Sequence, residues 1–285
     1  MPSKAQAGFA ADVVDALLDD VLDRLRRRHA PWLVGLSGLQ GSGKSTLARQ
    51  FAAAANAHGV ATVVLSLDDF YLGRRERARL ARTVHPLLAT RGVPGTHDIP
   101  LLTHTLAALA TASRRQPAWL PRFDKGRDTR LPPSRWRRVT APPRLVLLEG
   151  WCVGVPAQAA AALVRPLNAL ERNEDRDRRW RGWVNAQLAG AYARLWRRLN
   201  LLVVLQAPDF AVVQRWRDEQ ERTLRARHAP RAMDAAALAR FLQHYERLSR
   251  HALRALPRHA DVLLRLRGDR SVARPTRPRT PEHRA

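Results

Sequence analysis

The sequence predicts an α/β fold in which a parallel sheet of five strands carries helices on both faces. Five short apolar runs, several rich in β-branched residues, are spaced along the chain, and helical or long mixed stretches separate four of them. A glycine-rich loop joins the first run to a helical stretch, as in a βα unit. The runs that we expect to be strands cover residues 32–36, 61–67, 144–148, 201–206 and 261–266.

Composition limits the class of protein. The chain has 285 residues, 45% of them hydrophobic, so it can bury the core of one large α/β domain or two small ones. No apolar run approaches the ~20 residues of a membrane span, and the acidic, amphipathic N-terminus is unlike a signal peptide. The single cysteine, Cys152, excludes an internal disulfide and is typical of a reducing compartment. We expect a cytoplasmic protein without a membrane partner.

The formal charge of +25 could suggest nucleic-acid binding, but its distribution argues against a specific site. Lysine occurs only at positions 4, 44 and 125, so arginine supplies nearly all the positive charge, and alanine is abundant. This skew is typical of a codon-composition bias. We predict no specific nucleic-acid partner, and only salt-dependent, non-specific binding to polyanions. Where arginine is the default cation, a retained lysine such as Lys44 or Lys125 needs its own explanation.

The remaining segments follow in order along the chain. An amphipathic helix is predicted at 8–28, within an N-terminal segment 1–29 that packs on the main domain, 30–267. The proline-rich stretch 70–143 is too long for a simple crossover, so we expect a substrate-binding insert there, with one helix around 99–114.

The C-terminal half is predicted to be mainly helical between its strands. Helical stretches are expected at 155–199 and 210–256, and the aromatic residues Trp180, Trp183, Tyr192 and Trp196 are expected to pack in the core. Arginine and proline dominate residues 268–285, which contain few apolar side chains, so we predict a disordered tail.

Residues 38–46, Gly-Leu-Gln-Gly-Ser-Gly-Lys-Ser-Thr, match the Walker A phosphate-binding loop G-x-x-x-x-G-K-[ST] without a mismatch. A polyphosphate needs backbone N–H groups turned toward it, in backbone conformations that glycine adopts most easily. The lysine then reaches the β- and γ-phosphates, and the following hydroxyl binds Mg²⁺. The sequence therefore predicts ATP and Mg²⁺ as cofactors, bound through Gly38, Gly41, Ser42, Gly43, Lys44, Ser45 and Thr46.

Acidic residues directly follow two of the predicted strands. Asp68 and Asp69 end the second, and Glu149 ends the third. Doubly wound sheets bind ligands at the carboxyl ends of their strands, where a kinase needs carboxylates for its acceptor hydroxyl and metal. The alternative is that each acid caps the next helix or turn. Finding the pattern twice beside a phosphate-binding loop favours a functional role.

Further blocks of the sequence occur in the order known from one family. They are residues 66–72 (Ser-Leu-Asp-Asp-Phe-Tyr-Leu), 85–98, 120–125 (Leu-Pro-Arg-Phe-Asp-Lys), 147–154 and 201–208 followed by 216–222. From about residue 30 to 265, the chain resembles the plant-type D-glycerate 3-kinases. These belong to a larger group of P-loop small-molecule kinases with uridine kinase, phosphoribulokinase and bacterial pantothenate kinase. The resemblance implies a P-loop fold of the nucleoside-monophosphate-kinase kind.

The resemblance also implies roles for individual residues. Asp68 matches the general base toward the acceptor hydroxyl, and Glu149 matches the acid that holds Mg²⁺ near Ser45. With Lys44, Asp68 and Glu149 are the catalytic candidates. The acceptor site is implied to include Asp68, Tyr71, Arg91, His97, Asp98, Arg122, Asp124 and Lys125. A lid at about 210–232 is implied to cover the transferring phosphoryl group with one or two of Arg215, Arg217, Arg222 and Arg225.

The predicted function is ATP-dependent phosphoryl transfer to a hydroxyl of a small organic acid, which the resemblance implies is D-glycerate, giving 3-phosphoglycerate. Arginine binds a carboxylate bidentately and aspartate accepts hydrogen bonds from hydroxyls, although Arg91 and Arg122 could also be ordinary surface arginines. Two alternatives stay open: the same chemistry on pantothenate, uridine or a sugar, and a nucleic-acid-associated ATPase. Residues 126–130 form a shorter segment than the family has at this place. This departure bears on the identity of the acceptor more than on phosphoryl transfer.

Overall fold

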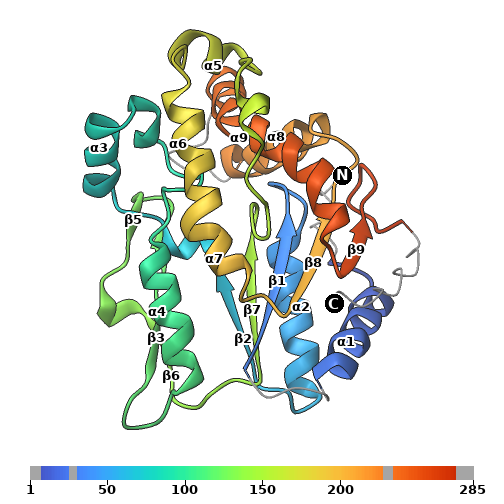
Figure 1. The fold of residues 1–285 in the computed structure, drawn as a ribbon. Helices are drawn as coiled ribbons and strands as arrows, with labels where there is room; N and C mark the ends of the chain where they lie inside the picture. Colours follow the sequence, from blue (N-terminus) through green and yellow to red (C-terminus); the bar gives the residue numbers. More distant parts are fainter. Residues whose placement is uncertain (1–7, 26–30, 227–233, 274–285) are drawn as a thin grey trace.

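The computed structural model describes residues 8–25, 31–226 and 234–273, and it confirms the predicted α/β fold (Figure 1). Five strands form one parallel sheet in the order β2-β7-β1-β8-β9. They are β1 (Trp32–Gly38), β2 (Thr62–Ser66), β7 (Leu145–Gly150), β8 (Leu201–Gln206) and β9 (Val262–Arg265). All five lie within one or two residues of the predicted apolar runs.

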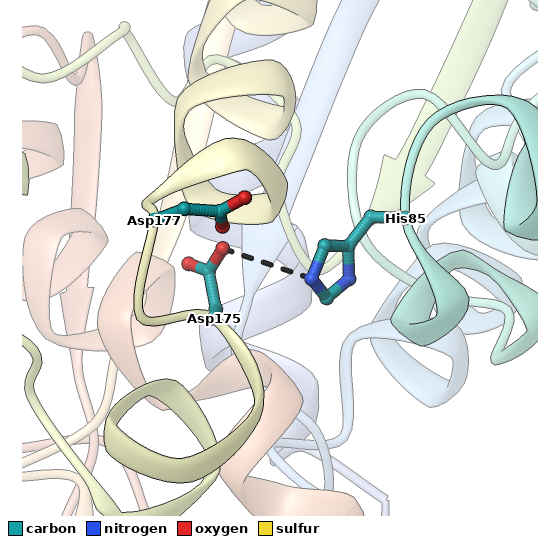
Figure 2. Close-up of side chains that lie close together, drawn as sticks. All are labelled: His85, Asp175 and Asp177. Atoms are coloured by element: carbon teal, nitrogen blue, oxygen red, sulfur yellow. Dashed lines mark ion pairs between the residues drawn. The ribbon is translucent and has the colours of Figure 1, made fainter.

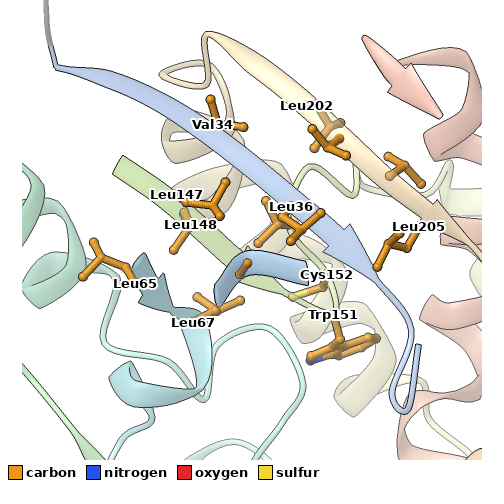
Figure 3. Packing of buried hydrophobic residues seen from close by; sticks show 14 of the residues in the cluster. Val34, Leu36, Leu65, Leu67, Leu147, Leu148, Trp151, Cys152, Leu202 and Leu205 are labelled. Atoms are coloured by element: carbon orange, nitrogen blue, oxygen red, sulfur yellow. The ribbon is translucent and has the colours of Figure 1, made fainter. Parts of the chain in front are cut away.

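The apolar character of the strands explains the sheet's place in the molecule. Every residue of β1 and β7 is buried, so side chains on both faces of these strands are covered. Leucines and valines of neighbouring strands pack together across the sheet, as Figure 3 shows for Val34, Leu36, Leu147, Leu148 and Leu202. A near-continuous apolar run is therefore what a central parallel strand with two covered faces requires.

The winding of the chain locates the ligand-binding edge. From β1 the chain builds β2 and β7 on one side, and then β8 and β9 on the other. In the register, Ser66 lies opposite Glu149, and Ser37 lies opposite Gly150. The carboxyl ends of β1, β2 and β7 therefore meet where the direction of winding reverses, which is the usual ligand position in such sheets.

Helices surround the sheet (Figure 1). Helix α1 (Ala11–Leu25) packs against α2 (Lys44–Ala57), and α8 (Ala211–Ala226) packs against α9 (Ala235–Ala255). Within the described residues, no helix is long and apolar enough to cross a membrane.

The prediction of continuous helix over 155–199 is only partly correct. Helices α5 (Ala169–Glu174), α6 (Arg179–Gln187) and α7 (Ala193–Trp196) form, with a π-helical turn at Leu188–Tyr192, but 155–168 holds only a 3₁₀ turn at Ala160–Leu163. Pro156 and Pro166 explain the difference, because proline disrupts the interior of a helix. Trp180 and Tyr192 are buried and Trp183 and Trp196 are partly buried against the core, as predicted.

The stretch between β2 and β7 forms a compact group of small elements. It contains α3 (Arg74–Thr83), α4 (Ile99–Ala110) and two small antiparallel pairs, β3 (Ala118–Leu120) with β6 (Arg137–Val139), and β4 (Phe123–Asp124) with β5 (Thr129–Arg130). A 3₁₀ turn at Leu67–Phe70 leads from β2 into this group. The acids that follow β2 therefore lie between the sheet and the segments 85–98 and 120–125.

The C-terminal residues differ from the prediction. Residues 268–273, predicted to begin a disordered tail, instead form a turn after β9, in which Leu266 bridges Val272. The composition of these residues did not reveal the side-chain contacts that hold them, which are described below. Residues 274–285 of the predicted tail and residues 227–232 of the predicted lid lie outside the described residues.

Candidate active site

The phosphate-binding loop connects β1 to α2. Gly41 and Gly43 have φ values of 82° and 88°, in the left-handed region that glycine adopts without strain. Gly43 is the N-terminal cap of α2, and the N–H groups of Gly43, Lys44 and Ser45 make no backbone hydrogen bond to any described residue. Free N–H groups at the positive end of a helix dipole can bind an anion. The loop therefore has the geometry that the motif predicts.

Three oxygen-bearing side chains meet beside this loop. Glu149 of β7 is 4% exposed, and its Oε1 accepts hydrogen bonds from Ser45 Oγ at 2.9 Å and Ser66 Oγ at 2.8 Å. Glu149 Oε2 is buried without a hydrogen-bond partner among the described residues. A carboxylate oxygen with free lone pairs beside a hydroxyl is the donor set that Mg²⁺ prefers. The sequence reasoning did not identify Ser66, although it ends the strand that precedes Asp68.

Asp68 lies in the 3₁₀ turn that follows β2, and it lines a cavity together with Lys44 and Glu149. Its Oδ1 accepts a hydrogen bond from the Tyr71 hydroxyl at 2.9 Å, and its Oδ2 pairs with Lys125 Nζ at 2.5 Å. Burial alone would raise the pKa of Asp68, but the ammonium groups of Lys125 and Lys44 outweigh burial and hold the pKa well below its ordinary value. Asp68 is therefore a carboxylate over the whole neutral range.

Replacing Lys125 with methionine is expected to raise the pKa of Asp68, because the carboxyl stays buried but loses its nearest positive charge. A carboxyl group whose pKa is lower in the folded than in the unfolded state stabilises the folded protein at pH values above its unfolded-state pKa. This stabilisation is lost as the pH falls through the folded-state pKa. The Lys125→Met variant should retain less of this stabilisation. NMR titration of the Asp68 carboxyl measures the shift. Arg127→Met, on the same hairpin but paired with Asp124, is the matched control; an unchanged Asp68 pKa in Lys125→Met would contradict the prediction.

The Asp69 side chain has a different partner from that of Asp68. Its Oδ1 accepts a hydrogen bond from the backbone N–H of Phe123 at 3.0 Å, and burial raises its pKa. Asp69 thus fastens the 120–125 segment to the end of β2. This hydrogen bond holds the segment where Lys125 can reach Asp68.

The 85–98 segment contributes Arg91 to the cavity. Arg91 Nη1 pairs with Asp128 Oδ1 at 2.5 Å, and its guanidinium lies over the Phe123 ring at 5.7 Å. Asp128 also pairs with the buried Arg77 at 2.5 Å. Asp128, in the segment that departs from the family pattern, therefore holds the Arg91 side chain in place.

The backbone of this segment is also fixed. The Tyr245 hydroxyl donates to the carbonyl of Arg91 at 2.9 Å, and Trp151 Nε1 donates to the carbonyl of Gly92 at 3.0 Å. Gly92 has a φ of 131°, and a Cβ there would lie 1.9 Å from the Tyr245 hydroxyl. Only glycine therefore fits at this position.

A cavity of about 290 Å³ joins these groups. Of the predicted site residues, it is lined by Gly41, Lys44, Ser45, Asp68, Tyr71, Arg91, Lys125, Glu149 and Arg217. Gln40, Ser66, Trp151, Phe241 and Tyr245 also line it and were not predicted. Phe241 and Tyr245 come from α9, and no local pattern in that helix signals a cavity far away in the sequence.

Several predicted acceptor residues lie outside the cavity lining. His97 is buried, with its Nδ1 at 2.7 Å from the Tyr192 hydroxyl and its ring stacked on Tyr71 at 4.6 Å; burial lowers the pKa of His97 to about 4. Asp98 caps α4 through Leu101 N–H and pairs with Arg130 at 3.0 Å. Arg122 is exposed, and Asp124 accepts a hydrogen bond from Arg127 N–H.

The other predicted phosphate-loop and lid residues are placed as follows. Gly38 ends β1, Ser42 is buried, and Thr46 lies in the first turn of α2. Of the lid arginines, Arg217 lies over the Phe241 ring at 5.9 Å, whereas Arg215 and Arg222 are exposed. The side chain of Arg225 is outside the described part of the structure.

A second group, His85, Asp175 and Asp177, has residue types that bind metals, and its ligand atoms lie within 4.8 Å of one another (Figure 2). Asp175, however, already accepts hydrogen bonds from Trp180 N–H and Arg181 N–H, and pairs with the buried Arg181 guanidinium at 2.6 Å. A bound cation would be repelled by that guanidinium. We therefore assign this group to the start of α6 as a structural cap.

The chain is similar in sequence to curated kinases, although no protein-family model matches it. It is 33% identical to the uncharacterized kinase mug58 of Schizosaccharomyces pombe over 247 residues, covering 82% of this chain and 85% of that protein. It is 30% identical to the chloroplastic D-glycerate 3-kinase of Arabidopsis thaliana over 207 residues, covering 68% of this chain and 42% of the plant protein.

A solved structure agrees with the sequence comparison. The D-glycerate 3-kinase of Cryptococcus neoformans var. grubii aligns with a TM-score of 0.76 at 25% identity, covering 92% of this chain and 98% of that one. Fold, phosphate-binding loop and relatives thus agree. The chain belongs to the D-glycerate 3-kinase family of P-loop kinases, and it is an ATP-dependent small-molecule kinase.

Proposed function

We propose that this kinase transfers the γ-phosphoryl group of ATP to the 3-hydroxyl of D-glycerate, giving 3-phosphoglycerate and ADP. The observation that carries the proposal is the meeting of Asp68, Lys125 and Arg91 in the same cavity as Lys44. A carboxylate that can accept a hydroxyl proton, beside cations that can bind a carboxylate, suits a small hydroxy acid. The relatives named D-glycerate 3-kinase support the same acceptor.

The size of the cavity also supports a compact acceptor. Pockets for drug-sized ligands occupy about 300–1,000 Å³, and this cavity of about 290 Å³ must also hold the terminal phosphate groups. A cavity of this volume is compatible with a small acceptor such as a three-carbon acid.

In the proposed mechanism, the loop N–H groups and Lys44 bind the polyphosphate. Ser45 and Glu149 would hold Mg²⁺, which neutralises charge on the phosphates when bound. Asp68 orients the acceptor hydroxyl and takes its proton as the hydroxyl oxygen bonds to the γ-phosphorus. The bond from that phosphorus to the bridging oxygen breaks, and ADP leaves. Arg217, on α8, lines the cavity, and in this proposal it stabilises the transferring group.

The assignment of domains is part of this proposal. We propose that residues 70–143 form the acceptor-binding insert and that 210–232 form the lid, with the N-terminal segment 1–29 packed on the domain 30–267. Closure of the lid would exclude water from the reacting groups.

A panel of acceptors tests the proposal. ADP release, measured with a coupled assay, should be stimulated strongly by D-glycerate, weakly by L-glycerate and glycerol, and not by uridine, pantothenate or hexoses. NMR of the product should place the phosphate on carbon 3. Stimulation by another alcohol would favour a related kinase activity, and stimulation by DNA or RNA with no active acceptor would favour a nucleic-acid-associated ATPase.

Replacing Arg91 with alanine is expected to raise the KM for D-glycerate by about 10- to 100-fold, since a hydrogen-bonded charge contact contributes about 1.5–3 kcal/mol. The KM for ATP should not change, and neither should the residual activity with glycerol, which has no carboxylate. Arg75→Ala, an exposed arginine on α3, is the matched control. An equal loss with glycerol and glycerate would contradict carboxylate binding by Arg91.

A further inference from the structure

The residues after β9 fold back on themselves to form a closed turn, residues 266–273, which we call the C-terminal turn. Arg267 N–H donates to the Ser271 carbonyl at 2.8 Å, and Ala273 N–H donates to the Arg265 carbonyl at 2.8 Å. Arg270 lies at the tip with a φ of 71°, a conformation that costs free energy in a non-glycine residue. Contacts of the Arg270 side chain must compensate for this strain.

The Arg270 side chain makes three contacts outside the turn. Its Nε donates to the carbonyl of Gly41 in the phosphate-binding loop at 2.7 Å. Its Nη2 pairs with Glu219 of α8 at 2.7 Å, and its guanidinium lies 5.2 Å from the centre of the Trp216 ring, also on α8. The side chain is only 16% exposed. One residue thus joins the phosphate-binding loop to the helix that carries Arg217.

Trp216 reinforces the same junction. Its Nε1 donates to the Gly268 carbonyl of the C-terminal turn at 2.8 Å. A Cβ added to Gly41 would lie 2.6 Å from the Trp216 Cβ, so the loop backbone packs directly on α8. The loop, α8 and the C-terminal turn therefore form one contact region.

The hydrogen bond from Arg270 fixes the orientation of a peptide group in the loop. Gly41 lines the cavity and Arg270 does not, so Arg270 holds the Gly41 carbonyl from outside the cavity lining. A rotated peptide would turn that carbonyl, with its partial negative charge, toward the anion. The same planar peptide group carries the N–H of Ser42, which donates to the Leu39 carbonyl at 3.1 Å, so both ends of this peptide are held.

We propose that Arg270 is a positioning residue for nucleotide binding, which holds the phosphate-binding loop in its anion-binding conformation and couples that loop to α8. It acts on the polyphosphate part of ATP through Gly41. This role is independent of which alcohol accepts the phosphoryl group.

The test compares Arg270→Ala with Arg267→Ala, an exposed arginine of the same turn whose side chain donates to Ser271 and Val272 within the turn. Arg270→Ala is expected to raise the Kd for Mg²⁺–ATP, measured by calorimetry, about 10-fold or more, because a charged donor to a backbone carbonyl is lost. The Kd for inorganic tripolyphosphate should rise by the same factor, and the KM for the acceptor should stay constant. Arg267→Ala should leave all three values unchanged.

Partial replacements separate positioning from general destabilisation. Arg270→Lys keeps a donor but not the planar fork, so its Kd for ATP should lie between those of the wild type and Arg270→Ala. Glu219→Gln removes the ionic anchor on α8 and should give a smaller rise. An unchanged ATP Kd in Arg270→Ala would overturn the proposal. A rise for ATP without one for tripolyphosphate would also overturn it, because the turn would then contact the nucleoside instead of orienting the loop.

Discussion

Replacing Asp68 with asparagine is expected to lower kcat by about 10²- to 10⁴-fold, the contribution usual for a positioned general base. The amide keeps the size of the side chain and can still accept a hydrogen bond from Tyr71, but it cannot take a proton. The Kd for ATP should change little, because Asp68 follows β2 and is not part of the phosphate-binding loop. Single-turnover kinetics with saturating ATP and acceptor measures the chemical step.

The low pKa of Asp68 gives this prediction a second part. A carboxylate held ionised by Lys125 and Lys44 is a weak base, so it accepts the proton late, when the new bond to phosphorus is largely formed. Protonation of Asp68 should therefore not lower kcat at any pH above the depressed pKa of Asp68. Asp12→Asn, an exposed acid in the first turn of α1, is the control. Near wild-type kcat in Asp68→Asn would remove the assigned role.

Replacing Lys44 with alanine is expected to cost roughly 3 kcal/mol or more of transition-state stabilisation, as the loss of one oriented group in a water-poor site does. The loss should appear in kcat and in the KM for ATP, because the ammonium is expected to contact the β- and γ-phosphates in both ground and transition states. Steady-state kinetics at fixed acceptor concentration measures both values.

Lys44→Arg tests whether a compact charge is needed. The planar guanidinium is larger than the ammonium and would crowd the first turn of α2, so we expect it to restore little activity. Arg49→Ala, on the exposed side of α2, is the control for changes in helix stability. If Lys44→Ala kept most of the wild-type kcat/KM, phosphate binding by this loop would be contradicted.

Much of the fold could be predicted from the sequence because its signals are local. Each central strand is an uninterrupted apolar run, and the Walker A residues are contiguous, so burial and loop geometry follow from short segments. The acids at the ends of β2 and β7 were identified for the same reason. The breaks in the helical stretch 155–199 were not predicted, although Pro156 and Pro166 are local signals for them.

The remaining features depend on contacts between distant residues. Nothing near Tyr245 in the sequence indicates that its hydroxyl binds the carbonyl of Arg91, and nothing near Arg270 indicates a bond to Gly41. Asp98, which the sequence resemblance assigned to the acceptor site, has a local signal of another kind: it precedes Ile99 and Pro100, a position typical of a helix cap, and it caps α4. Local capping chemistry was visible in the sequence, whereas long-range pairing required the folded chain.

The hydrogen bond between Tyr245 and the Arg91 carbonyl affects the order in which the phosphate-binding loop and the 85–98 segment can form during synthesis. The ribosome releases residue 91 long before residue 245, so a nascent chain can assemble β1 and its loop while the 85–98 segment still lacks its anchor. Prematurely terminated chains that end before α9 would lack this anchor and also β9 and Arg270. Both the acceptor side of the site and the phosphate-binding loop would then be incomplete, so we expect such fragments to have no kinase activity.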